Sequence, residues 1–158
     1  MKVFKIAVSY VAGFLVGFFV AYKLVSKSIN EWKRMSDKHF AILRLFNQWM
    51  IVRKEGGSIA EYLREKGYSR VIIYGMSYAG QRLLDDLAES KIEVITAIDR
   101  NAGTIEVPIS ILLPQDEFPD ADCIIVTAIY SFSEIKEMLS HKVNCPILSL
   151  EDILYKIS

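Results

Sequence analysis

The sequence predicts an α/β domain with a parallel sheet of about five strands, preceded by a transmembrane helix and an amphipathic connecting helix. Residues 6–22 are apolar and carry no charge. Over 26–55, apolar residues recur at spacings of three and four, which is typical of an amphipathic helix. From Tyr68 onward, short apolar runs alternate with helical patterns, as in a parallel α/β sheet. We therefore expect a span at 1–25, a connecting helix at 26–57 and a domain at 58–158.

Composition excludes several classes of function. Lysine plus arginine and aspartate plus glutamate are equal at 19 each, so no overall field attracts nucleic acid. Hydrophobic residues make up 52% of the 158 residues, and the excess lies mostly in the first 25. Cys123 and Cys145 have no zinc-motif spacing. We expect two small buried residues in a reducing compartment and no metal site.

The uncharged stretch at 6–22 is roughly 25 Å long as a helix, at about 1.5 Å per residue. Lys5 and Lys23 flank it and can extend towards the lipid head groups, which lengthens the usable span. A cleaved signal peptide is disfavoured because Phe19 stands where a small residue is needed before a cut at Ala21. A helix buried within the protein is disfavoured because no other segment covers it on all sides.

Charges around this span predict its orientation and its contacts. Two lysines precede the span and five basic residues follow it by position 38, so the positive-inside rule places the C-terminal side in the cytoplasm. Small residues four apart on one face let a second helix approach closely. We expect this face to contact a copy of the chain or another membrane protein, through Ser9, Gly13, Gly17 and Ala21.

The amphipathic pattern at 26–55 leaves two interpretations open. Heptad-like spacing is typical of a two-stranded coil between protomers, and the same stripe can pack on the domain that follows. Gly56 and Gly57 end the helix. Ser58 with Glu61 predicts a capped short helix, which Gly67 ends.

The domain is expected to begin with a strand at 71–74 and a helix at 78–90. Further strands are expected at 92–98, 105–109, 123–128 and 146–150, with helices at 133–140 and 151–157. The third strand is weak because Pro108 interrupts it. Right-handed crossovers predict the order 3-2-1-4-5, with ligands at the carboxyl ends of strands one and four.

The turn after the first strand resembles a dinucleotide-binding loop, with the pattern G-M-S-Y-A-G. Gly75 and Gly80 stand where the motif needs a tight turn and close helix–strand packing, but Ser77 replaces the glycine that approaches the pyrophosphate. Asp99 ends the second strand, where an acidic residue binds ribose hydroxyls. We predict a Rossmann-like crevice lined by Gly75, Met76, Ser77, Tyr78, Ala79, Gly80, Asp99, Arg100, Thr127 and Tyr130.

Residues from about 40 to 158 resemble the Rossmann-like domains of bacterial exopolysaccharide and capsule biosynthesis proteins, of the nucleoside-diphosphate-sugar epimerase or dehydratase type. The resemblance rests on F-N-Q-W, I-Y-G-M-S-Y-A-G, A-I-D-R-N, I-I-V-T-A-I and C-P-I-L-S-L-E-D-I-L. It implies NAD(P) or a nucleotide-sugar as ligand, and a polysaccharide-biosynthesis enzyme as partner. With the span, it implies a single-pass protein of the bacterial inner membrane with a cytoplasmic C-terminal domain.

No nucleophile–base pair can be traced near the crevice, and the second domain that would hold a sugar over a cofactor is missing. The favoured function is therefore a non-catalytic, membrane-anchored accessory protein that binds a nucleotide or nucleotide-sugar and docks with or regulates a partner. One alternative is an NAD(P)-dependent sugar-nucleotide oxidoreductase or epimerase completed by a partner chain. Another is a structural oligomerisation module with an empty crevice.

Overall fold

The structure, a computed structural model, describes the backbone of residues 2–157. Exposure and contacts are described for Gly13 and for residues 17–157. The chain divides into two compact units, Met1–Phe40 and Ala41–Ser158. In the described part, no helix is both long and apolar enough to cross a membrane. Ser9 and most side chains of the predicted span at 6–22 lie outside that part, so the span stays a prediction.

The helix α1 has the bounds Lys2–Lys54, and its residues up to Phe40 belong to the first unit. On the predicted small-residue face, a Cβ at Gly13 or Gly17 would have nothing within 4 Å apart from the adjacent backbone of the helix itself. That face therefore has room for a second helix at these two positions.

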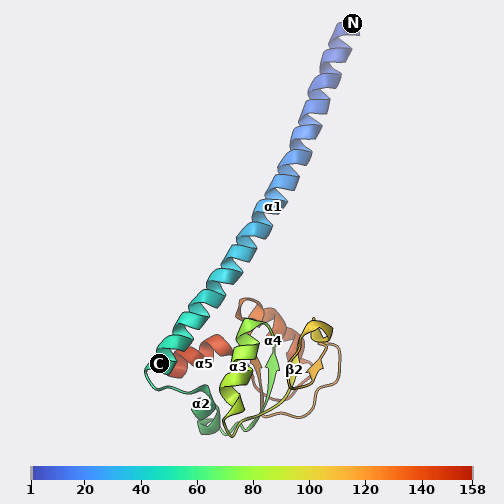
Figure 1. The fold of residues 1–158 in the computed structure, drawn as a ribbon. Coiled ribbons are helices and arrows are strands. Elements are labelled where there is room, and N and C mark those ends of the chain that lie inside the picture. The colour runs from blue at the N-terminus through green and yellow to red at the C-terminus, as the bar shows by residue number, and fades with distance from the viewer. Residues whose placement is uncertain (1, 158) are drawn as a thin grey trace. The chain divides into compact units, whose positions relative to one another are not determined.

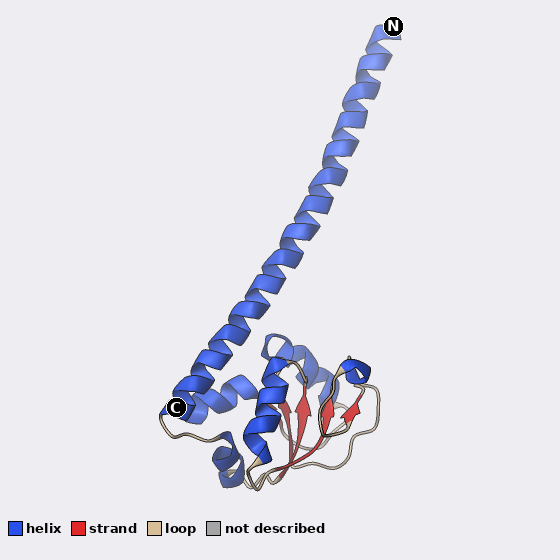
Figure 2. Cartoon of the chain, in the orientation of Figure 1, coloured by secondary structure: helices blue, strands red, loops and turns tan. Residues whose placement is uncertain are grey.

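The second unit is built on the predicted five-stranded parallel sheet, in the order β3-β2-β1-β4-β5 (Figure 2). From β1, the strands β2 and β3 extend the sheet towards one edge, and β4 and β5 extend it from the other side of β1. The order therefore reverses between β1 and β4, the point at which such sheets bind ligands. The strands are β1 (Arg70–Tyr74), β2 (Glu93–Ile98), β3 (Ile111–Leu112), β4 (Cys123–Val126) and β5 (Ile147–Ser149).

Helices cover both faces of this sheet (Figure 1). Alternate β1 residues point to opposite faces, with Val71 and Ile73 in one core and Ile72 and Tyr74 in the other. The first core includes residues from the C-terminal part of α1 and from α2 (Ile59–Glu65), α3 (Tyr78–Ala88) and α5 (Leu150–Ile157). The second core includes residues from α4 (Phe132–Ser140). Two short 3₁₀ turns, Ala102–Thr104 and Ile129–Ser131, follow β2 and β4.

The last turns of α1 pack in the first core of the second unit. For this part of the apolar stripe, the interpretation that it packs on the domain that follows is therefore correct. Leu45, Trp49 and Val52 are each at most 3% exposed within the core. Asp86 of α3 accepts a 3.1 Å hydrogen bond from Trp49 Nε1 and pairs with Arg53. The compact unit therefore begins in α1, at Ala41.

The segment between α1 and β1 follows the sequence prediction. Gly56 has a φ of +81° after the end of α1, and Gly67 has a φ of +79° after α2. Between them, the Ser58 hydroxyl accepts a hydrogen bond from the Glu61 amide at 3.3 Å and caps α2.

The third strand lies elsewhere than predicted. Residues 105–109 form no strand, and β3 is instead Ile111–Leu112, which pairs with Ala97 and Ile98 of β2. The alternating residues Ile105, Val107 and Ile109 pack partly buried against the first core. Alternation there reflects contact with the core, and pairing begins only beyond Pro108, which has no N–H to donate.

Candidate functional site

The predicted crevice lies at the carboxyl end of β1, beside β4. Gly75 turns the chain there with a φ of +95°, a conformation that side chains rarely adopt. Its N–H donates to the Ile98 carbonyl of β2 at 2.8 Å. A Cβ on Gly75 would lie 2.9 Å from Thr127 Oγ1, so space as well as conformation requires glycine.

Gly80 lies in the first turn of α3, where the helix meets this turn. A Cβ on Gly80 would stand 2.0 Å from the Gly75 carbonyl oxygen and 3.0 Å from its carbon. Real side chains do not tolerate such an approach to backbone. Gly80 therefore lets the N-terminus of α3 sit directly against the end of β1, as the third glycine of the motif does.

The start of α3 leaves polar backbone groups unpaired. Gln81 N–H donates to the Ser77 carbonyl at 3.0 Å, the first bond of the helical ladder. Within residues 2–157, the N–H groups of Tyr78, Ala79 and Gly80 meet no acceptor. Ser77 precedes them with extended backbone and an exposed hydroxyl that makes no capping bond. These donors and the helix dipole together favour an anion.

Asp99 faces the turn from the end of β2. Its Oδ2 accepts a hydrogen bond from the Met76 N–H at 2.7 Å, and its Oδ1 accepts one from the Asn101 N–H at 2.8 Å. The carboxylate is thus already partnered by the protein. Each oxygen keeps a further lone pair, which suits a hydroxyl donor such as that of a ribose.

Thr127 closes the other side of the turn and is fully buried. Its hydroxyl lies 2.6 Å from the Gly75 carbonyl oxygen and 3.2 Å from that of Tyr74, and both oxygens can accept from it. Its amide donates to the Tyr74 carbonyl at 2.9 Å. Thr127 therefore holds β4 to the turn, and its hydroxyl does not face a ligand.

The remaining predicted residues divide by exposure. Met76 and Ala79 are fully buried, so they offer the site only their backbone. Tyr78 is 83% exposed and Tyr130 is 46% exposed, and Arg100 is exposed at the end of β2. These three are exposed and do not form the turn itself.

One residue of the turn escaped sequence reasoning. Gln81 donates from Nε2 to the Met76 carbonyl at 3.1 Å and so supports the loop from the first turn of α3. No motif marks a glutamine at this position, because its contribution depends on where the loop carbonyl points.

The described residues of the site are hydrogen-bonding groups, and they include no nucleophile–base pair. Among the described residues, no cluster of His, Cys, Asp or Glu could hold a metal ion. Tyr74, at the end of β1, is 4% exposed, and its hydroxyl has no partner in the same part of the chain. This arrangement can bind an anion next to a hydroxyl-bearing group, and it offers no evident nucleophile and base.

Comparison of the chain with protein-family models, curated proteins and solved structures finds no match.

Proposed function

We propose that this protein is a membrane-anchored, non-catalytic accessory protein that binds a nucleotide or nucleotide-sugar at the start of α3. The observation that carries this proposal is the set of three unpaired amides at Tyr78, Ala79 and Gly80, with the Ser77 hydroxyl beside them. A phosphate satisfies such donors, and the spare lone pairs of Asp99 suit a sugar hydroxyl. The resemblance of residues 40–158 to polysaccharide-biosynthesis domains supports a partner in cell-surface polysaccharide synthesis, which this protein docks with or regulates.

A second candidate is a structural module whose crevice stays empty. The bond from Met76 N–H to Asp99 favours it, because the turn is held in place by the protein's own groups. The two candidates differ in whether a phosphate-bearing ligand stabilises the chain.

The test is a thermal-shift measurement on the full chain in detergent with NAD(H), UDP-glucose and coenzyme A, each at millimolar concentration. Ser77→Glu places a carboxylate over the free amides, where it competes with phosphate and favours the helix start. We expect at least one compound to raise the melting temperature of the parent chain, and Ser77→Glu to abolish that rise. Absence of any rise with all three would favour the empty module.

Ser133→Glu is the matched control, because Ser133 is exposed in the first turn of α4 and takes the same charge change. It should keep the full rise. An equal loss in both variants would indicate a general charge effect and would move the ligand away from α3. Gly80 is unsuitable for this test, because any side chain there meets the Gly75 backbone.

Membrane attachment is tested separately by washing membranes with alkaline carbonate. We expect the full chain to stay with the bilayer and a chain lacking residues 1–25 to be released. Release of the full chain would contradict the span while leaving the ligand proposal intact.

A further inference from the structure

The first unit carries a row of residues along α1 whose spacing alternates between four and three. Its first five side chains are apolar or aromatic, and each is more than half exposed, from 57% at Val25 to 69% at Trp32. An apolar row of this length is seldom left in water by a lone helix. The seam, as we call this row, consists of Phe18, Tyr22, Val25, Ile29, Trp32, Ser36 and His39.

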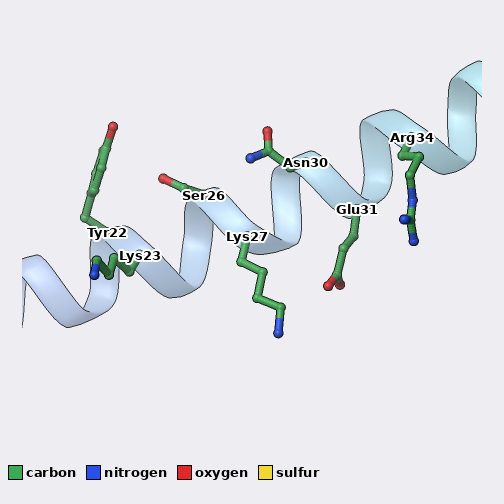
Figure 3. Close-up of a pocket in the computed structure, with 7 residues that line it drawn as sticks. All are labelled: Tyr22, Lys23, Ser26, Lys27, Asn30, Glu31 and Arg34. Carbon is green, nitrogen blue, oxygen red and sulfur yellow. The ribbon is translucent and has the colours of Figure 1, made fainter.

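Four basic residues occupy the opposite side of the same helix. Lys23, Lys27, Arg34 and Lys38 are spaced by four, seven and four, which keeps them near one line at 3.6 residues per turn. Figure 3 shows Lys27 and Arg34 extending away from the side on which Tyr22 lies. All the residues that line the hollow drawn there come from one helix, so it is an open surface along α1.

We propose that the seam pairs with the seam of a second copy of this chain, as a parallel two-stranded coiled coil over residues 18–39. Alternation of four and three is the spacing of the two core positions in a heptad repeat. The positions that flank the row are also apolar at Phe19, Met35 and Phe40, which are exposed by 49–66%, so the apolar face includes the positions beside a coiled-coil core. The proposal does not depend on the ligand. Phe18, Tyr22 and Val25 belong to the predicted span at 1–25, so in a spanning chain the pair begins in the bilayer and continues beyond it.

The area of the seam suits a partner of this kind. Phe18, Tyr22 and Trp32 are aromatic, and an aromatic side chain buries roughly 150–250 Å² when fully covered. Three from each of two helices therefore bring the total near the roughly 1,000 Å² that a specific interface requires. Val25 and Ile29 contribute further apolar area between them.

Charge also favours a second copy. The basic row lies on the outer side, so two identical helices can meet along their seams without bringing these cations together. Ser26 and Ser28 flank the seam between Val25 and Ile29 and carry no charge. Lys33 flanks the seam beside Trp32, and in a parallel pair it lies opposite Ser28 of the other copy, which does not repel it. An identical helix is thus electrostatically compatible along the seam despite the positive charge of the segment.

The two polar residues of the seam specify a parallel pair. In a parallel pair each layer meets its own copy, so Ser36 faces Ser36 and His39 faces His39, and each can hydrogen-bond. In an antiparallel pair over the same residues these polar groups would face the aromatic end at Phe18 and Tyr22. A hydroxyl or imidazole buried against aromatic rings without a partner is unfavourable.

The test is cross-linking of the full chain, in detergent and in membranes, through single introduced cysteines. Cys145 is replaced by serine first, and Cys123 is kept because it is fully buried. Ile29→Cys lies on the seam, and Lys27→Cys lies on the outer side two residues away. We expect Ile29→Cys to form disulfide-linked dimers at least about fivefold more readily than Lys27→Cys, because only the seam brings the two copies together.

Equal cross-linking at both positions, or none at Ile29→Cys, would overturn the proposal. A second measurement is the mass of uncross-linked protein by light scattering, where Trp32→Glu should convert dimer to monomer and Arg34→Glu should not. A parent chain that is monomeric, or that is a dimer unaffected by Trp32→Glu, would also overturn it. So would quenching of Trp32 fluorescence by brominated lipid in vesicles, because that would place the seam against a bilayer.

Discussion

Gly75 and Gly80 mark the two places in the turn where backbone leaves no room for a side chain. The first needs a positive φ, and the second needs direct contact between a helix and a carbonyl group. Both demands are structural and exist without any ligand. Neither glycine can therefore be read as proof of nucleotide binding, and ligand tests belong at the exposed Ser77.

Gly80→Ala should destabilise the second unit strongly, by about 3 kcal/mol or more, because the added methyl must displace backbone. The measurement is urea unfolding followed by the fluorescence of Trp49, which is 3% exposed. Gly103→Ala is the control, because its Cβ would have no atom within 4 Å, and it should change stability by less than about 0.5 kcal/mol. Similar losses in both variants would contradict the close packing at Gly80.

Asp122 shows how a single carboxylate joins two strands at the other end of the sheet. It precedes β4 and accepts hydrogen bonds from the Ser69 amide at 2.7 Å, the Arg70 amide at 2.8 Å and the Ser69 hydroxyl at 3.0 Å. The amide bonds are the largest cause that lowers the pKa of Asp122 below its usual 3.8. The ionised form is therefore favoured in the folded chain.

Asp122→Asn should lower stability at neutral pH, and the gap from the parent chain should close in acid. A lowered folded pKa gives stability that is present above 3.8 and lost as the pH falls through the folded value. The measurement is the melting temperature from pH 7 down to pH 3, with Asp120→Asn, an exposed neighbour, as control. A gap that stays constant over this range would contradict the role of the charge.

At the scale of single residues, the sequence predicts where the backbone requires glycine better than it predicts which side chains form hydrogen bonds. The positions of Gly75 and Gly80 follow from motif spacing, because a turn and a close approach are local requirements. The bonds from Met76 N–H to Asp99 and from Thr127 to Gly75 join residues 23 and 52 positions apart. Such bonds depend on strand register and rotamers, so the sequence placed Thr127 in the crevice without showing that its hydroxyl is used internally.

Among the elements, the C-terminal part of α1 is the one whose pattern allowed two interpretations. Its stripe was equally compatible with a coil and with packing on the domain, because spacing does not reveal what covers a face. Asp86 supports packing on the domain for this part of the helix, because it accepts a hydrogen bond from Trp49 and forms an ion pair with Arg53. A tryptophan N–H needs a partner when buried, and Asp86 supplies it.

Asp86→Ala should lower the free energy of unfolding of the second unit by about 1–2 kcal/mol, mainly because Trp49 N–H loses its acceptor. Arg53 contributes less, because its side chain is 64% exposed. The adjacent Asp85→Ala is the control, since the one partner of Asp85 among the described side chains is the exposed Arg82 one turn away, and it should change stability by less than about 0.5 kcal/mol. Equal effects of the two substitutions would contradict this account.

The third strand shows the limit of pattern reading for an element. Ile105, Val107 and Ile109 alternate as a strand does, yet they pack on the core as irregular chain. A two-residue strand such as Ile111–Leu112 is too short to show the alternation of apolar and polar residues by which strands are recognised. Its register comes instead from bonds with β2, such as Ala97 N–H to the Ser110 carbonyl at 3.0 Å.

For the molecule as a whole, the order of the sheet was predictable, because right-handed crossovers leave few arrangements for alternating strands and helices. Both cysteines were predicted to be buried; Cys123 is, Cys145 is only partly buried, and both are free. Cys123 is fully buried, and burial raises the pKa of its thiol from 9.0 to about 12. Cys145 is half-buried, and burial raises the pKa of its thiol as well.

The native chain should therefore react with a thiol reagent at Cys145 alone at pH 8, and at both cysteines in denaturant. Cys123 should also make folding weaker in alkali, because the unfolded thiol ionises above pH 9.0 while the folded one does not. The measurement is peptide mapping after timed alkylation, with unfolding at pH 8 and pH 10 alongside. Rapid labelling of Cys123 in the native chain would show that the start of β4 opens without global unfolding.

The bonds around the turn have a further consequence for hydrogen exchange. The amides of Gly75, Met76 and Thr127 are all hydrogen-bonded, so they should exchange slowly. The amides of Tyr78, Ala79 and Gly80, which begin two residues after Met76, have no acceptor within residues 2–157. Protected and unprotected amides thus lie within a few residues of one another. Any anion that settles at the start of α3 will slow exchange at those three positions and leave the protected set unchanged. Hydrogen exchange at these amides therefore reports whether an anion is bound at the start of α3, even when the anion has not been identified.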